Sequence, residues 1–247
     1  MRITLLGTGD AFGSGGRFST CLHVALADGS AMLVDCAATS LLPLRQAGFD
    51  RNAISTLLFT HFHGDHFGGL PFFLLDAQFV AGRKAPLTIA GPKGVEARTR
   101  LLIDATYPGY ADVPNRGFDI TYREVTPEAP ATLAGVDIAA FPMIHDERAG
   151  PCQGYRLTHG GKVFGFSGDT SWTDSLVPLA DGADALVVEC NSYDRAIPSH
   201  LDYLTLSRRL PELKARRIVI THMGPQMLAH DEPLAVERAV DGMVIAL

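Results

Sequence analysis

The sequence lacks a long hydrophobic run, and this absence bears on where the protein works. The longest apolar stretch near a predicted helix, LPFFLLDAQFV, is interrupted by Asp76 and is too short to span a bilayer. The first residues, MRITLLGTGDAFG, lack the long apolar stretch and small-residue cleavage site of a signal peptide. These absences predict a cytoplasmic protein without a membrane partner.

Positive charge and closely spaced cysteines are also scarce. The formal net charge of the 247 residues is -6, which argues against a nucleic-acid partner but leaves room for a local phosphate site. The four cysteines are scattered without a CxxC pair, and three of them lie in or beside apolar strand-like runs. This distribution predicts buried free thiols rather than disulfides or a zinc knuckle, at Cys21, Cys36, Cys152 and Cys190.

Strand-like and helix-like segments alternate along the whole chain, and no linker or repeat divides them. The pattern predicts one α/β domain over residues 1–247, with helices outside packed sheets. We expect helices at about 67–80, 93–105, 171–180 and 202–213. We expect strands at 3–7, 22–27, 31–35, 55–60, 87–91, 136–144, 154–158, 162–169, 183–190 and 216–222, with THGGKV as a hairpin turn.

Residues 60–69 read THFHGDHFGG, and further metal-capable side chains follow other strands. His61 follows STLLFT, His145 follows DIAAFPMI, Asp169 follows KVFGFSG, and His222 follows RRIVIT. In α/β sheets the loops at the carboxyl ends of strands converge on the active site. Four such residues beside a histidine cluster predict a metal centre at that edge.

The cluster offers enough donors for two ions. His61 and His63 could present imidazoles to one ion, with His145 as the third nitrogen, while Asp65 and His66 face a second ion together with His222. Asp169 could bridge the two ions as a carboxylate. Two ions would lower the pKa of a bridging water and stabilise the attacking and leaving oxygens. Zn²⁺ is expected, with Mn²⁺ or Fe²⁺ as alternatives.

The order HxHxDH, isolated His, Asp and final His, each after a strand, resembles the metallo-β-lactamase superfamily of metallohydrolases over nearly the whole chain. The resemblance implies a four-layer αβ/βα sandwich, two mixed β-sheets flanked by helices. It also implies the metal ligands His61, His63, Asp65, His66, His145, Asp169 and His222, with Asp65 also catalytic. Relatives of this kind are commonly homodimers.

Within the superfamily, the segment ECNSYDRAIPSHLDYLTL followed by RRIVITHMGP is similar to tRNase Z and the phosphoribosyl cyclic phosphodiesterases. His200 matches a histidine that protonates or stabilises the reacting phosphate and leaving group, and Glu189 matches the acid that orients it. The long arm by which tRNase Z grips tRNA has no counterpart, because only 23 residues separate His145 from Asp169. The N-terminal cysteine cluster of the cyclic phosphodiesterases is likewise reduced to Cys21.

These observations predict a dinuclear-metal-dependent hydrolase that cleaves a small or cyclic phosphodiester with a metal-bridging hydroxide, helped by His200. Hydrolysis of a carboxylic ester, lactone, thioester or aryl sulfate on the same metals is the alternative. A tRNA 3'-processing endonuclease and a non-catalytic metal-binding protein are disfavoured, the first by the missing arm and the second by the complete ligand set.

Several other residues are candidates for supporting roles. Asp35 ends a strand beneath the site, where it would either hydrogen-bond a ligand histidine or cap a helix. The glycine-rich GTGDAFGSGG fits a turn at the rim of the site better than a phosphate cradle. Arg17 and Phe18 in that turn could contact the substrate. Arg148, Tyr193 and Arg195 flank the loops of the ligands and could bind a phosphate, although arginines are also common on any surface.

Overall fold

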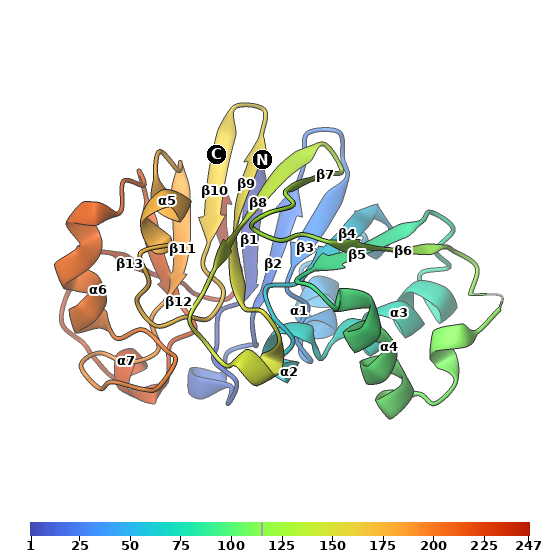
Figure 1. The fold of residues 1–247 in the computed structure, drawn as a ribbon. Helices are drawn as coiled ribbons and strands as arrows, with labels where there is room; N and C mark the ends of the chain where they lie inside the picture. Colours follow the sequence, from blue (N-terminus) through green and yellow to red (C-terminus); the bar gives the residue numbers. More distant parts are fainter. Residues whose placement is uncertain (115) are drawn as a thin grey trace.

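Two β-sheets packed face to face form the centre of the protein (Figure 1). The computed structural model describes residues 1–114 and 116–247, and each sheet has seven strands within these ranges. The first sheet has the order β14-β1-β2-β3-β4-β5-β6. Its strands are β1 (Arg2–Gly7), β2 (Cys21–Ala25), β3 (Ala31–Val34), β4 (Ile54–Leu58), β5 (Leu87–Gly91), β6 (Ile120–Glu124) and β14 (Met243–Ala246).

The second sheet has the order β13-β12-β11-β10-β9-β8-β7. Parallel pairing joins β10 to β11, β11 to β12 and β12 to β13, while β7, β8, β9 and β10 pair antiparallel. The strands are β7 (Ala131–Leu133), β8 (Val136–Pro142), β9 (Gln153–His159), β10 (Lys162–Phe166), β11 (Ala185–Glu189), β12 (Ile218–Thr221) and β13 (Glu237–Arg238).

The central strands are apolar at successive positions because both of their faces are buried. In β11, Val187 points into the core between the sheets, and Leu186 and Val188 point into the core on the outer face. In β3, Val34 lies between the sheets, whereas Leu33 lies on the outer face. Because successive side chains of a strand point to opposite faces, each of these strands contributes residues to both cores.

Helices cover the outer face of each sheet and complete four layers (Figure 1). Leu70, Phe73 and Leu74 of α3 pack on the first sheet, and Leu179 and Leu206 of α5 and α6 pack on the second. The helices are α1 (Leu41–Gln46), α2 (Gly64–Phe67), α3 (Leu70–Phe79), α4 (Val95–Thr106), α5 (Leu176–Ala180), α6 (Tyr203–Arg209) and α7 (Pro225–Leu228). Short 3-10 turns are η1 (Ser14–Gly16), η2 (Arg51–Ala53), η3 (Tyr110–Asp112), η4 (Glu147–Ala149) and η5 (Leu210–Glu212).

The predicted four-layer α/β sandwich is confirmed, as are the buried free cysteines and the hairpin between β9 and β10. Gly160 and Gly161 have φ of 59° and 73°, which this two-residue turn requires. The helix predicted at 67–80 begins instead at Leu70, after Gly69, which packs so closely that a Cβ would lie 2.0 Å from the Ala37 carbonyl oxygen. The helix predicted at 171–180 begins only at Leu176.

None of the helices in the described part of the chain is both long and apolar enough to cross a membrane. This observation agrees with the shortness of the hydrophobic runs in the sequence.

Candidate active site

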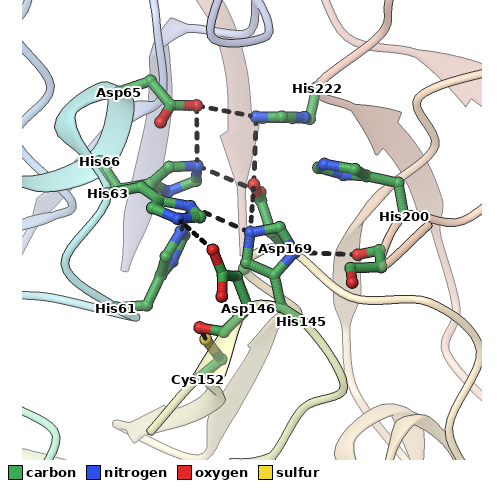
Figure 2. Close-up of polar contacts among 12 residues, drawn as sticks. His61, His63, Asp65, His66, His145, Asp146, Cys152, Asp169, His200 and His222 are labelled. Atoms are coloured by element: carbon green, nitrogen blue, oxygen red, sulfur yellow. Dashed lines mark hydrogen bonds and ion pairs between the residues drawn. The ribbon is translucent and has the colours of Figure 1, made fainter. Parts of the chain in front are cut away.

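Histidine and aspartate side chains from both sheets meet beyond the carboxyl ends of β4, β10 and β12 (Figure 2). His61 follows β4, and α2 begins at Gly64, so that His63, Asp65 and His66 are presented within one turn. Asp169 follows β10 and His222 follows β12. His222 has a φ of 57°, a left-handed backbone that is costly for a non-glycine residue and is typical of functional sites.

Three ring nitrogens converge at one end of the cluster. Nδ1 of His63 lies 3.2 Å from Nε2 of His61 and 3.1 Å from Nε2 of His145. Nitrogens arranged tetrahedrally around Zn²⁺ at about 2.0–2.1 Å would lie about 3.3–3.4 Å from one another. The spacing of this trio is therefore close to that of a zinc site.

The second group places two carboxylates beside two imidazoles. Nε2 of His222 lies 3.2 Å from Oδ2 of Asp65 and 3.3 Å from Oδ2 of Asp169. Nε2 of His66 lies 3.1 Å from Oδ1 of Asp169, whose Oδ2 is also 3.7 Å from Nε2 of His145. Asp169 consequently lies between the two groups, where its oxygens can reach both.

The rear nitrogens of these rings are held from outside the cluster, as is usual for metal-binding histidines. Nδ1 of His66 contacts the buried carboxylate of Asp35 at 2.7 Å, which also accepts a 2.8 Å hydrogen bond from Thr60 N. Nδ1 of His145 donates to the Ser199 carbonyl oxygen at 2.9 Å. Of the two roles predicted for Asp35, contact with a cluster histidine is correct and helix capping is wrong.

An unsatisfied buried atom indicates that the cluster suits a cation. With Nδ1 of His66 bound to Asp35, its Nε2 is buried and points into the cluster, where Oδ1 of Asp169 lies 3.1 Å away without the geometry of a hydrogen bond. A buried polar atom without a partner is costly unless something else coordinates it. Imidazole nitrogen and carboxylate oxygen are the donors that Zn²⁺ takes readily.

The electrostatics of the cluster hold two of its rings neutral and two of its carboxylates ionised. Burial lowers the pKa of His61 well below its usual value and also lowers the pKa of His145, which keeps both rings neutral. Burial opposes ionisation of Asp169, but the His222 and His66 rings hold the pKa of its carboxyl well below the usual range. Asp65 is likewise kept ionised, because His66 and His222 outweigh its burial.

His200 lies beside the cluster and is oriented by Glu189. Nδ1 of His200 is 3.0 Å and 3.2 Å from the two carboxylate oxygens of Glu189, which is buried and also accepts from Thr170 N and Leu201 N. Burial lowers the pKa of His200, but its hydrogen bond and charge interaction with Glu189 outweigh this and raise it overall. The His200 ring stacks parallel to that of His222, with centroids 5.5 Å apart.

A cavity of about 370 Å³ opens onto these groups. Phe12 and Ile197 form apolar parts of its wall, and Phe12 is 90% exposed. The loop carrying Phe12 is held by the buried Asp10, whose carboxylate accepts from Phe12 N at 3.1 Å and from Ser14 N and Oγ at 2.9 and 2.7 Å. GTGDAFGSGG is therefore a turn at the rim, as expected. Sequence reasoning missed Phe12, although an apolar residue in a glycine-rich turn was the available signal.

Five other residues proposed from the sequence to contact substrate do not line this cavity. Arg17 donates to Thr8 Oγ1 and the Ala239 carbonyl, and so braces the rim loop. The Tyr193 ring stacks with those of Tyr203 and His230. Among described residues the cavity lining contains no lysine or arginine. The five residues that lie outside it are Arg17, Phe18, Arg148, Tyr193 and Arg195.

A family model described as "Anti-Pycsar protein Apyc1" matches residues 1–240. The chain belongs to this family. It is also 33% identical over 205 residues to ribonuclease Z of Mycobacterium bovis, covering 76% of this chain and 69% of that protein. Ribonuclease Z of Lachnoclostridium phytofermentans is 33% identical over 156 residues, 63% of this chain and 47% of that protein. The chain thus spans about half the length of the first curated relatives it matches.

Solved structures confirm the fold. Human tRNase Z, short form, superposes with a TM-score of 0.80 at 24% identity, covering 100% of this chain and 99% of that one. A diphosphatase from the PhnP family gives 0.79 at 19%, covering 100% and 97%. Zn²⁺-bound PqqB from Methylobacterium extorquens gives 0.76 at 15%, covering 100% of both chains. The metallo-β-lactamase-fold protein YhfI from Bacillus subtilis gives 0.76 at 20%, covering 99% and 98%. The predicted likeness to metallo-β-lactamase-fold, tRNase Z-like hydrolases is confirmed.

Proposed function

We propose that this protein is a metal-dependent phosphodiesterase that hydrolyses a small or cyclic phosphodiester. The observation that carries the proposal is that His200, braced by Glu189, shares one cavity with the histidine–aspartate cluster. The residue that would donate a proton to the leaving group is thereby placed beside side chains suited to hold metal ions. The names of the relatives, a ribonuclease and a diphosphatase, support chemistry at phosphorus.

The ligand set follows from the two groups of donor atoms. His61, His63 and His145 would hold one divalent ion, Asp65, His66 and His222 a second, and Asp169 would contact both. Such ions, when bound, supply a water activated near neutral pH and neutralise charge on a phosphate. Zn²⁺ fits the nitrogen spacing, and Mn²⁺ and Fe²⁺ are the alternatives.

The remaining residues would bind the substrate and move the proton. Nδ1 of His200 is committed to Glu189, so its Nε2 can donate a proton to the leaving oxygen. Because the described lining contains no lysine or arginine, His200 and any bound ions would bind the phosphate. The size of the cavity favours a small molecule, and the segment between His145 and Asp169 forms only η4 and the β9–β10 hairpin.

The decisive assay is hydrolysis of bis(p-nitrophenyl) phosphate by protein loaded with Zn²⁺ or Mn²⁺. We expect metal-dependent turnover of this diester, and none of p-nitrophenyl sulfate or a lactone. Turnover of the sulfate or lactone alone would replace the proposal with the alternative ester chemistry. Cleavage of precursor tRNA in preference to small diesters would indicate a ribonuclease Z activity instead.

The position of Phe12 predicts a preference for substrates with a planar ring. Phe12→Ala should lower kcat/KM about two- to ten-fold for uridine 2',3'-cyclic phosphate, since a stacked aromatic pair contributes about 0.5–1.5 kcal/mol. The rate with the methyl riboside 2',3'-cyclic phosphate, which has no base, should be unchanged. Phe79→Ala, which removes another exposed ring far along α3, is the control. An equal loss on both substrates would contradict the stacking role.

A further inference from the structure

His63 differs from the other histidines of the cluster in its exposure. Its side chain is 35% exposed, whereas those of His66, His145 and His222 are at most 4% exposed. Packing therefore fixes the buried rings but leaves His63 with rotational freedom. Its Nδ1 is one of the three converging nitrogens, so its Nε2 points away from the cluster.

One carboxylate meets His63 on that outer side. Oδ2 of Asp146 lies 3.5 Å from Nε2 of His63 (Figure 2). Asp146 directly follows His145, so two successive residues act on the trio in different ways. The His145 ring contributes one of the three nitrogens, and the Asp146 carboxylate contacts the outer nitrogen, Nε2, of His63.

The carboxylate of Asp146 is itself held in one orientation by Arg148. The guanidinium of Arg148 donates through Nε to Oδ1 at 2.9 Å and to Oδ2 at 3.1 Å, and through Nη2 to Oδ2 at 2.8 Å. The backbone N–H of Arg148 also donates to Oδ1 at 3.0 Å, which caps η4. A planar fork of this kind fixes both the position and the plane of a carboxylate.

The loop that carries Asp146 is joined to the loop that carries His63. Phe62 N donates to the Ala149 carbonyl oxygen at 3.1 Å, and Gln153 N donates to the Thr60 carbonyl oxygen at 3.2 Å. Gly150 packs against the Phe62 ring so closely that a Cβ would lie 2.8 Å from it. The two loops, one from each sheet, therefore hold Asp146 at a fixed place behind His63.

We propose that Asp146 is a positioning residue that holds the His63 imidazole with Nδ1 turned toward the first metal ion, and that Arg148 holds Asp146. The inference rests on the proposed ligand set. It adds Asp146 as an outer partner of His63, the most exposed residue of that set. The partner accepts the Nε2 proton of His63, so the lone pair of the ring is on Nδ1.

The test measures metal affinity by competition with a chromophoric chelator, which needs no substrate. Asp146→Ala should weaken binding of one Zn²⁺ equivalent about ten- to one hundred-fold and leave the other equivalent unchanged. Asp146→Asn should have a smaller effect, because its amide oxygen can still accept from Nε2. Arg148→Ala should fall between the wild type and Asp146→Ala. The thermal midpoint of metal-free Asp146→Asn, which keeps the oxygen that caps η4, should match that of the wild type, which separates positioning from stability.

Asp112→Ala is the matched control, because Asp112 also pairs with an arginine, at 2.9 Å from Arg100, and its side chain is 83% exposed. It should bind both equivalents like the wild type. Wild-type affinity for both equivalents in Asp146→Ala would overturn the positioning role and leave the proposed phosphodiesterase activity standing. A wild type that binds no metal would overturn the ligand set and this role together.

Discussion

Asp169→Ala is expected to release at least one equivalent of metal and to lower kcat for phosphodiester hydrolysis on the order of 10³-fold or more. In the wild type the two carboxylate oxygens of Asp169 lie 3.1 Å from His66 Nε2 and 3.3 Å from His222 Nε2, and this carboxylate lies between the two donor groups. Removing it takes a ligand from both proposed ions and leaves the buried rings to repel each other when protonated. Metal content and turnover are measured on the same preparation.

Asp169→Asn separates charge from shape in this experiment, because it keeps the volume while weakening coordination. Asp137→Ala is a control, because Asp137 is exposed on β8 and its carboxylate accepts a hydrogen bond from Thr132 Oγ1. It should keep both metal and rate. If Asp169→Ala retained two metal equivalents and full turnover, the shared-ligand role of Asp169 would be wrong.

The candidate cluster could be predicted because its signals are local. Each strand that delivers a side chain is a short apolar run, and His61, His145, Asp169 and His222 each follow such a run within a few residues. Parallel strands have their carboxyl ends at one edge of a sheet whatever their order. The donors therefore meet even though the strand order itself was not predicted from the residues.

Edge strands and the contacts between loops could not be predicted in this way. β13 has two residues and β7 has three, and β6 carries polar residues on an exposed face, so none of them shows an apolar run. Asp146 lies next to His145 in the sequence, but its contact is with His63, which is 83 residues away. Such a contact depends on how two loops dock, and local sequence patterns carry no information about that.

The buried carboxylate of Glu189 is held in place by hydrogen bonds from two loops of the site. Burial raises the pKa of this carboxyl, although hydrogen bonding by His200 opposes the rise. Its oxygens accept from Thr170 N beside Asp169 and from Leu201 N beside His200. One buried carboxylate thus anchors both the loop of a proposed metal ligand and the proposed acid, and an isolated buried charge would be too costly without these donors.

His200→Ala is expected to keep both metal equivalents and to lose rate in a way that depends on the leaving group. For a cyclic ribose phosphate, whose alkoxide leaving oxygen needs a proton, kcat should fall on the order of 10²–10⁴-fold. For bis(p-nitrophenyl) phosphate the fall should be much smaller, because p-nitrophenolate leaves without protonation. The comparison of the two substrates measures proton donation rather than general damage to the site.

His159→Ala provides the control for this experiment, because His159 lies in the β9–β10 hairpin and its Nδ1 contacts the Gly135 carbonyl, away from the cavity. It should leave both rates unchanged. Glu189→Gln should reproduce part of the selective loss, since the amide can still accept from Nδ1 of His200 but lacks the charge that favours its protonated form. Equal losses on both substrates in His200→Ala would rule out proton donation to the leaving oxygen and would leave His200 a role in binding the phosphate. Undiminished turnover of both substrates would mean that His200 is only a structural residue.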